Sequence, residues 1–153
     1  MSAAAERGAV GPVEEGRTFA ALCANCVTVK VWSTPDCRWK VFANRPPLHA
    51  YTQHKERRTL LEAMHDAWQH YFKGGMPVTV TDQDARTLSD CVRHLTAIKG
   101  LTVTWHNGFF FAQIGENQLT PQGFRTLLEA VRTLAAANAW SPVAAPRPAA
   151  KWK

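Results

Sequence analysis

The chain lacks any apolar segment long enough to cross a membrane. Its 153 residues are 46% hydrophobic, yet no run reaches the 18 or more apolar residues that a transmembrane helix requires. The first thirteen residues do not follow the basic-then-apolar layout of a secretory signal peptide, because they are rich in Ala and Gly and contain Glu6 and Arg7. We therefore expect a soluble, cytoplasmic protein with no membrane partner.

Cysteine is also scarce, with four residues in the chain. This number argues against a disulfide-stapled secreted scaffold. Cys23 and Cys26 form a C-x-x-C motif, and Cys37 and His49 could complete a zinc site with them. However, Cys26 runs directly into a strand pattern, whereas a redox C-x-x-C usually opens a helix. Ordinary thiols are the first interpretation, and a metal site and a redox pair are the weaker alternatives.

Motifs that define common catalytic sites are missing. The sequence contains no P-loop, no G-x-G-x-x-G after a strand, no G-x-S-x-G and no H-E-x-x-H. Paired carboxylates are not evident near the basic residues described below. An enzyme would need folding to bring together Asp36, Cys37, His49 or His54, and we expect neither catalysis nor a cofactor.

Hydrophobic periodicity predicts an α+β domain over residues 21–140. Alternating residues predict strands over 27–32, 38–43, 101–106 and 109–114, and a short strand over 77–80. Apolar stripes predict helices from about 54 to 72, from 81 to just before Gly100, and from Thr120–Pro121 onward. The predicted order is β-β-α-β-α-β-β-α, a single antiparallel sheet with the helices on one face. Residues 1–20 and the Pro/Ala-rich basic segment 141–153 are expected to be flexible.

Three helical segments are nearly alike: Arg58 to Met64, Arg86 to Val92 and Arg125 to Val131 all begin with Arg-Thr-Leu. Residues Thr81 to Leu95 and Thr120 to Leu134 share 8 of 15 residues without a gap. Two ββα units sharing one sheet would explain the likeness. Convergence of amphipathic helices built from Arg, Thr, Leu, Glu and Ala would explain it equally.

Positive charge is concentrated in one segment. The formal net charge is +6, and residues 38–58 contribute +5 of it, since one acid, Glu56, faces six cations. The predicted helix from about 54 would carry cations in its first turn, where the helix dipole favours anions. Such a conflict is expected at a functional site. The candidate nucleic-acid or anion-binding residues are Arg38, Lys40, Arg45, His54, Lys55, Arg57 and Arg58.

Aromatic residues are interleaved with these cations, and Phe109-Phe-Phe111 places three in a row on one strand. Because neighbouring residues of a strand point to opposite faces, at least one phenylalanine must leave the helix-packed face. The aromatic surface candidates are Trp32, Trp39, Phe42, Tyr51 and Phe110. An open sheet face bearing them would be a platform for bases or a protein-binding surface. A second cover or a homodimer through that face are the alternatives.

The alternation of hairpins and helices resembles type III secretion chaperones in outline, although those are typically acidic and begin with a helix. An aromatic sheet face is similar to that of single-stranded nucleic-acid binders, but the RNP signature is absent. The first hypothesis is therefore a basic, non-enzymatic nucleic-acid-binding regulator or accessory factor. The alternative is an adaptor, chaperone or inhibitor that binds another protein, such as a nucleic-acid-processing enzyme. The simplest explanation of the charge, solubility alone, stays open.

Overall fold

The computed structural model describes residues 3–52, 56–116, 118–119 and 122–142, and it confirms the α+β class. The elements are α1 (Ala3–Asn25), β1 (Thr28–Ser33), β2 (Trp39–Asn44), β3 (Tyr51–Thr52), α2 (Leu60–Tyr71), α3 (Asp82–Thr96), β4 (Leu101–His106), β5 (Phe109–Ile114), β6 (Gln118–Leu119) and α4 (Leu127–Ala137). Within these described ranges no helix is both long and apolar enough to cross a bilayer.

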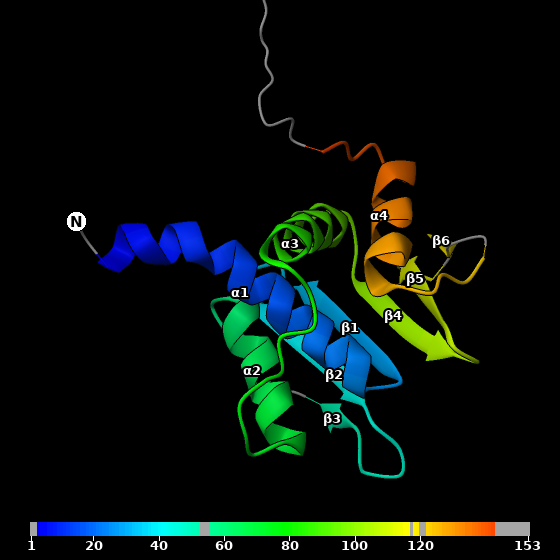
Figure 1. The fold of residues 1–153 in the computed structure, drawn as a ribbon, viewed down its shortest axis with the longest axis horizontal. Helices are drawn as coiled ribbons and strands as arrows, with labels where there is room; N and C mark the ends of the chain where they lie inside the picture. The colour runs from blue at the N-terminus through cyan, green and yellow to red at the C-terminus, as the bar shows by residue number, and fades with distance from the viewer. Residues whose placement is uncertain (1–2, 53–55, 117, 120–121, 143–153) are drawn as a thin grey trace, which may run out of the picture.

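All six strands belong to one antiparallel sheet with the order β3-β2-β1-β4-β5-β6. Helices α1, α2 and α3 lie on the same side of it (Figure 1). The core forms between these layers. Its sheet contribution is the alternating set Val29, Val31, Val41, Ala43, Leu101, Val103, Ala112 and Ile114.

The fold is an internal repeat, but the repeating unit is α-β-β-β-α rather than ββα. The sheet order is symmetric about the pairing of β1 with β4, which exchanges β2 with β5 and β3 with β6. Isolated bridges extend both halves in the same way, between Trp39 and Arg57 and between Phe110 and Phe124. The direct pairing of Lys30 with Thr102 marks the local two-fold axis.

This symmetry reassigns the Arg-Thr-Leu segments. Thr59 caps α2 and Thr126 caps α4: each hydroxyl accepts a hydrogen bond from the backbone N–H of a glutamate three residues later, Glu62 or Glu129. In α3 the cap is Thr81, and Thr87 lies inside the helix, where its hydroxyl donates to the Gln83 carbonyl. The copies in α2 and α4 are therefore structurally equivalent, whereas the copy in α3 is similar in sequence only.

The first element was not predicted. Residues 1–20 were expected to be flexible, yet Ala3–Asn25 is a helix, and Val13, Phe19 and Leu22 are buried in the core. Its packing against α3 is close, because a Cβ added at Gly16 would lie 1.9 Å from the backbone oxygen of Ala85. Glycine is thus required where the two helices meet.

Other predicted boundaries also shift. Helix α2 begins at Leu60 rather than near residue 54, and α4 begins at Leu127, because the Thr caps set both starts. Phe124 therefore pairs with Phe110 at the sheet edge instead of lying on a helix, while Thr120 and Pro121 fall outside the described residues. Residues 77–80 form no strand; Val78 is exposed, and the segment links α2 to α3 by passing in front of α1 (Figure 1).

The reassigned repeat predicts which threonines stabilise the protein. Replacing Thr59 or Thr126 with Ala removes a cap and should cost about 1 kcal/mol of unfolding free energy each. Thr87→Ala should change it by less than about 0.5 kcal/mol, because that residue lies inside a helix and Ala is a better helix former. Urea denaturation followed by circular dichroism measures all three. Equal losses at the three positions would contradict the assignment.

Two glycines of α1 provide a matched pair for the α1–α3 contact. Nothing lies within 4 Å of a Cβ added at Gly11, so Gly11→Ala should stabilise the protein by up to about 1 kcal/mol through helix propensity. Gly16→Ala should instead destabilise it by about 1–3 kcal/mol, since the methyl group meets the α3 backbone. Thermal unfolding of both variants tests this, and a stabilising Gly16→Ala would show that the helices do not approach so closely.

Candidate functional site

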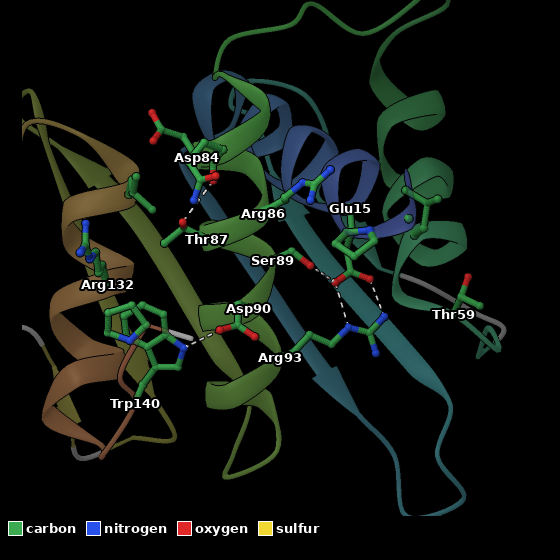
Figure 2. A pocket seen from close by; sticks show the side chains of 16 residues that line it. Glu15, Thr59, Asp84, Arg86, Thr87, Ser89, Asp90, Arg93, Arg132 and Trp140 are labelled. Atoms are coloured by element: carbon green, nitrogen blue, oxygen red, sulfur yellow. Dashed lines mark hydrogen bonds and ion pairs between the residues drawn. The ribbon is translucent and has the colours of Figure 1, made fainter. Parts of the chain in front are cut away.

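A depression of about 900 Å³ lies over α3, between α1 and α4 (Figure 2). On its α1 side, the buried carboxylate of Glu15 accepts a hydrogen bond from the Ser89 hydroxyl at 2.7 Å. It also accepts two from the Arg93 guanidinium, at 2.9 and 2.5 Å. Hydrogen bonding to Glu15 raises the pKa of Arg93, whose guanidinium also lies 5.3 Å from the ring centroid of Trp39. Burial of this carboxylate is thus compensated by internal partners.

The α4 side of the depression is closed in the same manner. The indole N–H of Trp140 donates to Asp90 at 2.8 Å, which ties the end of α4 to α3. Figure 2 shows Arg86 and Arg132 on opposite sides of α3, so these two cations do not converge on one point. The Glu15 and Asp90 contacts join helices to one another. The depression is therefore a seam between helices.

The second face of the sheet, here called the open face, is the strongest candidate. It is formed by the residues that alternate with the core positions, and these are exposed or partly exposed. Its residues include Lys30, Trp32, Lys40, Phe42, Thr102, Thr104, Phe109 and Phe111. Aromatic side chains thus stand on both halves of a solvent-facing sheet.

Charge on this face has one predominant sign. The six strands contain two lysines and no acid, and Lys30 and Lys40 both lie on the open face. Trp32 pairs directly with Lys40 across β1 and β2, and the Lys30 ammonium lies 5.2 Å from the Trp32 ring centroid. One acid borders the face, because the bridge between Trp39 and Arg57 places Glu56 beside Lys40. The centre therefore combines a cation with an aromatic ring.

Glycines let these rings lie close to the backbone. A Cβ added at Gly100 would lie 3.1 Å from the Trp32 Cβ, and one at Gly123 would lie 2.6 Å from Phe109 and 2.9 Å from Phe111. Gly100 thus lies against an open-face aromatic of the first half of the sheet, and Gly123 lies against two of the second half. Side chains at these positions would push the rings away from the sheet.

Of the predicted basic residues that the structure describes, Arg57, Arg45 and Arg38 already have partners, and the bridge between Trp39 and Arg57 brings Arg57 and Arg58 beside Arg38 and Lys40. Arg57 makes two hydrogen bonds to Asp66, at 2.6 and 3.2 Å, and this interaction raises its pKa. Arg45 donates to the Asn25 carbonyl at 2.7 Å and lies over the Phe72 ring. Arg38 is 3.4 Å from Asp36. Arg58 is exposed, and His54 and Lys55 lie outside the described residues.

The predicted conflict at the start of the first sequence-derived helix is also absent. Because α2 begins at Leu60, Arg57 and Arg58 precede the Thr59 cap, and the acid Glu62 occupies the first turn. The Thr59 hydroxyl already accepts from the Glu62 N–H, as in a capping box. The Thr59 side chain thus caps the start of the helix, so an anion is not needed for this role.

Two of the five aromatic candidates, Trp32 and Phe42, lie on the open face. The other three, Trp39, Tyr51 and Phe110, pack against the core on the helix side. Of the three consecutive phenylalanines, Phe109 and Phe111 lie on the open face and Phe110 on the other, and Lys30, which was not among the candidates, also lies on the open face. Strand parity could have separated the phenylalanines: Phe110 shares a face with Ala112 and Ile114, so Phe109 and Phe111 must point the other way.

Three of the four cysteines are buried thiols. Burial raises the pKa of Cys23 well above its ordinary value, that of Cys26 to about 11 and that of Cys91 to about 12. Cys23 lies in the last turn of α1, so the motif closes a helix instead of opening one. Among the described residues no three His, Cys, Asp or Glu side chains are placed to hold a metal ion. Cys23, Cys26, Cys37 and His49 are therefore not assembled as a site.

Thiol reactivity tests this arrangement. Cys37 is exposed in the β1–β2 turn, whereas the other three thiols are buried and protonated at neutral pH. Ellman's reagent at pH 8 should label about one thiol per folded chain within minutes, and four in urea. Cys37→Ser should abolish the fast phase. Rapid labelling that persists in this variant would mean that the C-x-x-C pair is accessible and ionised.

Comparison with known proteins adds no relative: no family model matches the chain, and neither a curated protein nor a solved structure matches it significantly.

Proposed function

We propose that the protein is a non-enzymatic, nucleic-acid-binding accessory factor that engages single strands through the open face. The observation that carries the proposal is the combination of Trp32 and Phe42 with Lys30 and Lys40 on strands that contain no acid. Unpaired bases stack on aromatic side chains with about 1–3 kcal/mol per base, and lysines attract the phosphates. With two lysines at the centre, the affinity comes mostly from stacking.

The register explains how a strand could lie on this face. Phe42 and Lys30 are direct partners across β2 and β1, and Lys40 and Trp32 are the next pair on the same face. The two pairs therefore place an aromatic and a cation alternately, about 7 Å apart along the strands. This spacing suits two neighbouring bases with a phosphate beside each. Thr102 and Thr104 continue the face as hydrogen-bonding residues.

A second function, that of an adaptor, chaperone or inhibitor for another protein, is favoured by a different observation. Helix α1 precedes β1, so one of the two differences from type III secretion chaperones no longer holds, while the basic charge remains. Recovery of partners from the native host with and without nuclease treatment separates the two functions. A homodimer through the open face would bury Trp32 and Phe42 and would compete with nucleic acid. The free thiols agree with a cytoplasmic location, which is part of this proposal.

The proposal predicts the behaviour of open-face variants. Trp32→Ala should weaken binding of a fluorescein-labelled dT12 or U12 oligonucleotide by about 1–3 kcal/mol, measured by anisotropy at 50 mM salt. A plot of log affinity against log salt concentration has a negative slope. The double variant Lys30→Gln with Lys40→Gln should make this slope shallower by about 1.4, because two phosphate contacts are lost.

Arg57→Gln is the matched control, since this cation is already paired with Asp66 and lies off the open face. It should leave both the affinity and the salt slope unchanged. Equal binding by wild type and Trp32→Ala, or an Arg57→Gln defect as large as that of the lysine variant, would refute the open face as the nucleic-acid site.

A further inference from the structure

A second exposed surface lies at the end of the sheet where β1 begins and β4 ends. It is a cleft of about 340 Å³ between the last turn of α1, the residues before β1, the turn after β2, the end of β4 and the start of β5. Val27, Trp105 and Phe110 provide its apolar lining, and Arg45 is the one charged residue that lines it among the described residues. It is separate from the open face, because Trp105 and Phe110 lie on the helix side of the sheet.

Exposed apolar groups gather at this cleft. Trp105 is 45% exposed and Val27 is 38% exposed, and they are neighbours, since the Trp105 N–H donates to the Val27 carbonyl at 2.8 Å. Leu48 is 53% exposed and lies in the turn after β2, where its backbone N–H donates to the Arg45 carbonyl. Among the six large hydrophobic residues that are exposed in the described part of the chain, Val27 and Trp105 line this cleft, and Leu48 is hydrogen-bonded to its Arg45. A clustered apolar surface of this kind marks an interaction site more often than scattered exposure does.

The internal repeat relates this cleft to the opposite end of the sheet, where the corresponding residues have different surroundings. Trp39 and Phe110 hold corresponding positions, because each is bridged to the segment before α2 or α4. Trp39 is covered by the guanidinium of Arg93, which Glu15 holds in place. Phe110 instead lines the cleft, and Trp105 occupies the position that corresponds to Ser33 in the first half.

Arg45 gives the cleft a charge preference. Its guanidinium is fixed by the Asn25 carbonyl at 2.7 Å and by the Phe72 ring, whose centroid is 4.9 Å away. Neither contact supplies an acid, so the positive charge at the cleft is not neutralised by them. A pre-positioned guanidinium beside an apolar surface favours a carboxylate attached to an apolar group, since little side-chain entropy remains to be lost.

We propose that this cleft docks an extended segment of a partner protein, which inserts an apolar side chain beside Trp105 and Phe110 and places a neighbouring carboxylate on Arg45. The charge complementarity at Arg45 selects an acidic segment. A protein segment fits better than a small molecule, because a further exposed apolar residue, Leu48, follows Arg45 in the same hydrogen-bonded turn. This docking does not depend on nucleic-acid binding by the open face.

Capped hexapeptides of the form Ac-Gly-Leu-X-Asp-Leu-Gly-NH2, with X as Leu, Phe or Trp, are the probe, and the same peptides with Asn in place of Asp are their charge controls. Binding is followed by the amide and indole N–H resonances of ¹⁵N-labelled protein. At least one Asp peptide should shift the Trp105 indole resonance and bind about tenfold more tightly than its Asn counterpart. Trp105→Ser, which introduces the residue of the equivalent position, should weaken this binding about tenfold or more.

Arg45→Met should remove the preference for Asp over Asn while leaving residual apolar binding, and its thermal unfolding reports whether the α1 end is intact. Trp32→Ser on the open face should not change peptide binding, and Trp105→Ser should not change oligonucleotide binding. Failure of the cleft proposal can therefore be distinguished from failure of the open-face proposal. The inference is overturned if no peptide binds at millimolar concentration, or if Trp105→Ser binds as wild type does. A dimer that Trp105→Ser dissociates in sedimentation would also overturn it, by showing that a second copy fills the cleft.

Discussion

The antiparallel pairing of β1 with β4 is the interaction on which the rest of this structure depends. It joins two α-β-β-β-α halves into one six-stranded sheet, with Lys30 opposite Thr102 at the local two-fold axis. Above this junction α1 meets α3 so closely that Gly16 admits no side chain. Because the two halves share one sheet and their helices contact each other, the strand pairing and the helix contact form the core together.

Departures from this symmetry occur where the candidate sites lie. In the first half Arg93 covers Trp39, and in the second half the corresponding Phe110 lines an exposed cleft. Lys40 and Phe111 occupy corresponding positions on the open face, as do Ser33 and Trp105 on the other side. A repeat stabilises the protein through its shared core positions, which leaves the unshared surface positions free to serve binding.

Sequence reasoning succeeded where local chemistry decides structure and failed where distant packing does. Period-2 alternation located the four long strands. Helix α1 was missed because it is packed on several sides: Phe19, Ala20, Ala21, Leu22 and Cys23 are consecutive and all buried. A helix surrounded in this way shows no amphipathic period, and its small, Gly-rich composition suggested a flexible segment.

The candidate sites divide in the same way. The charge excess of residues 38–58, the aromatic strands and the Arg-Thr-Leu copies are properties of the sequence by itself, and so is the parity that sends Phe109 and Phe111 away from Phe110. Only the tertiary structure decided that Arg57 is paired with Asp66, that Arg45 is held by the end of α1, and that two of the three copies are equivalent. The physical reason is distance along the chain: propensity and alternation act over a few residues, whereas the partner of a charge and the cover of a ring come from elements brought together by folding.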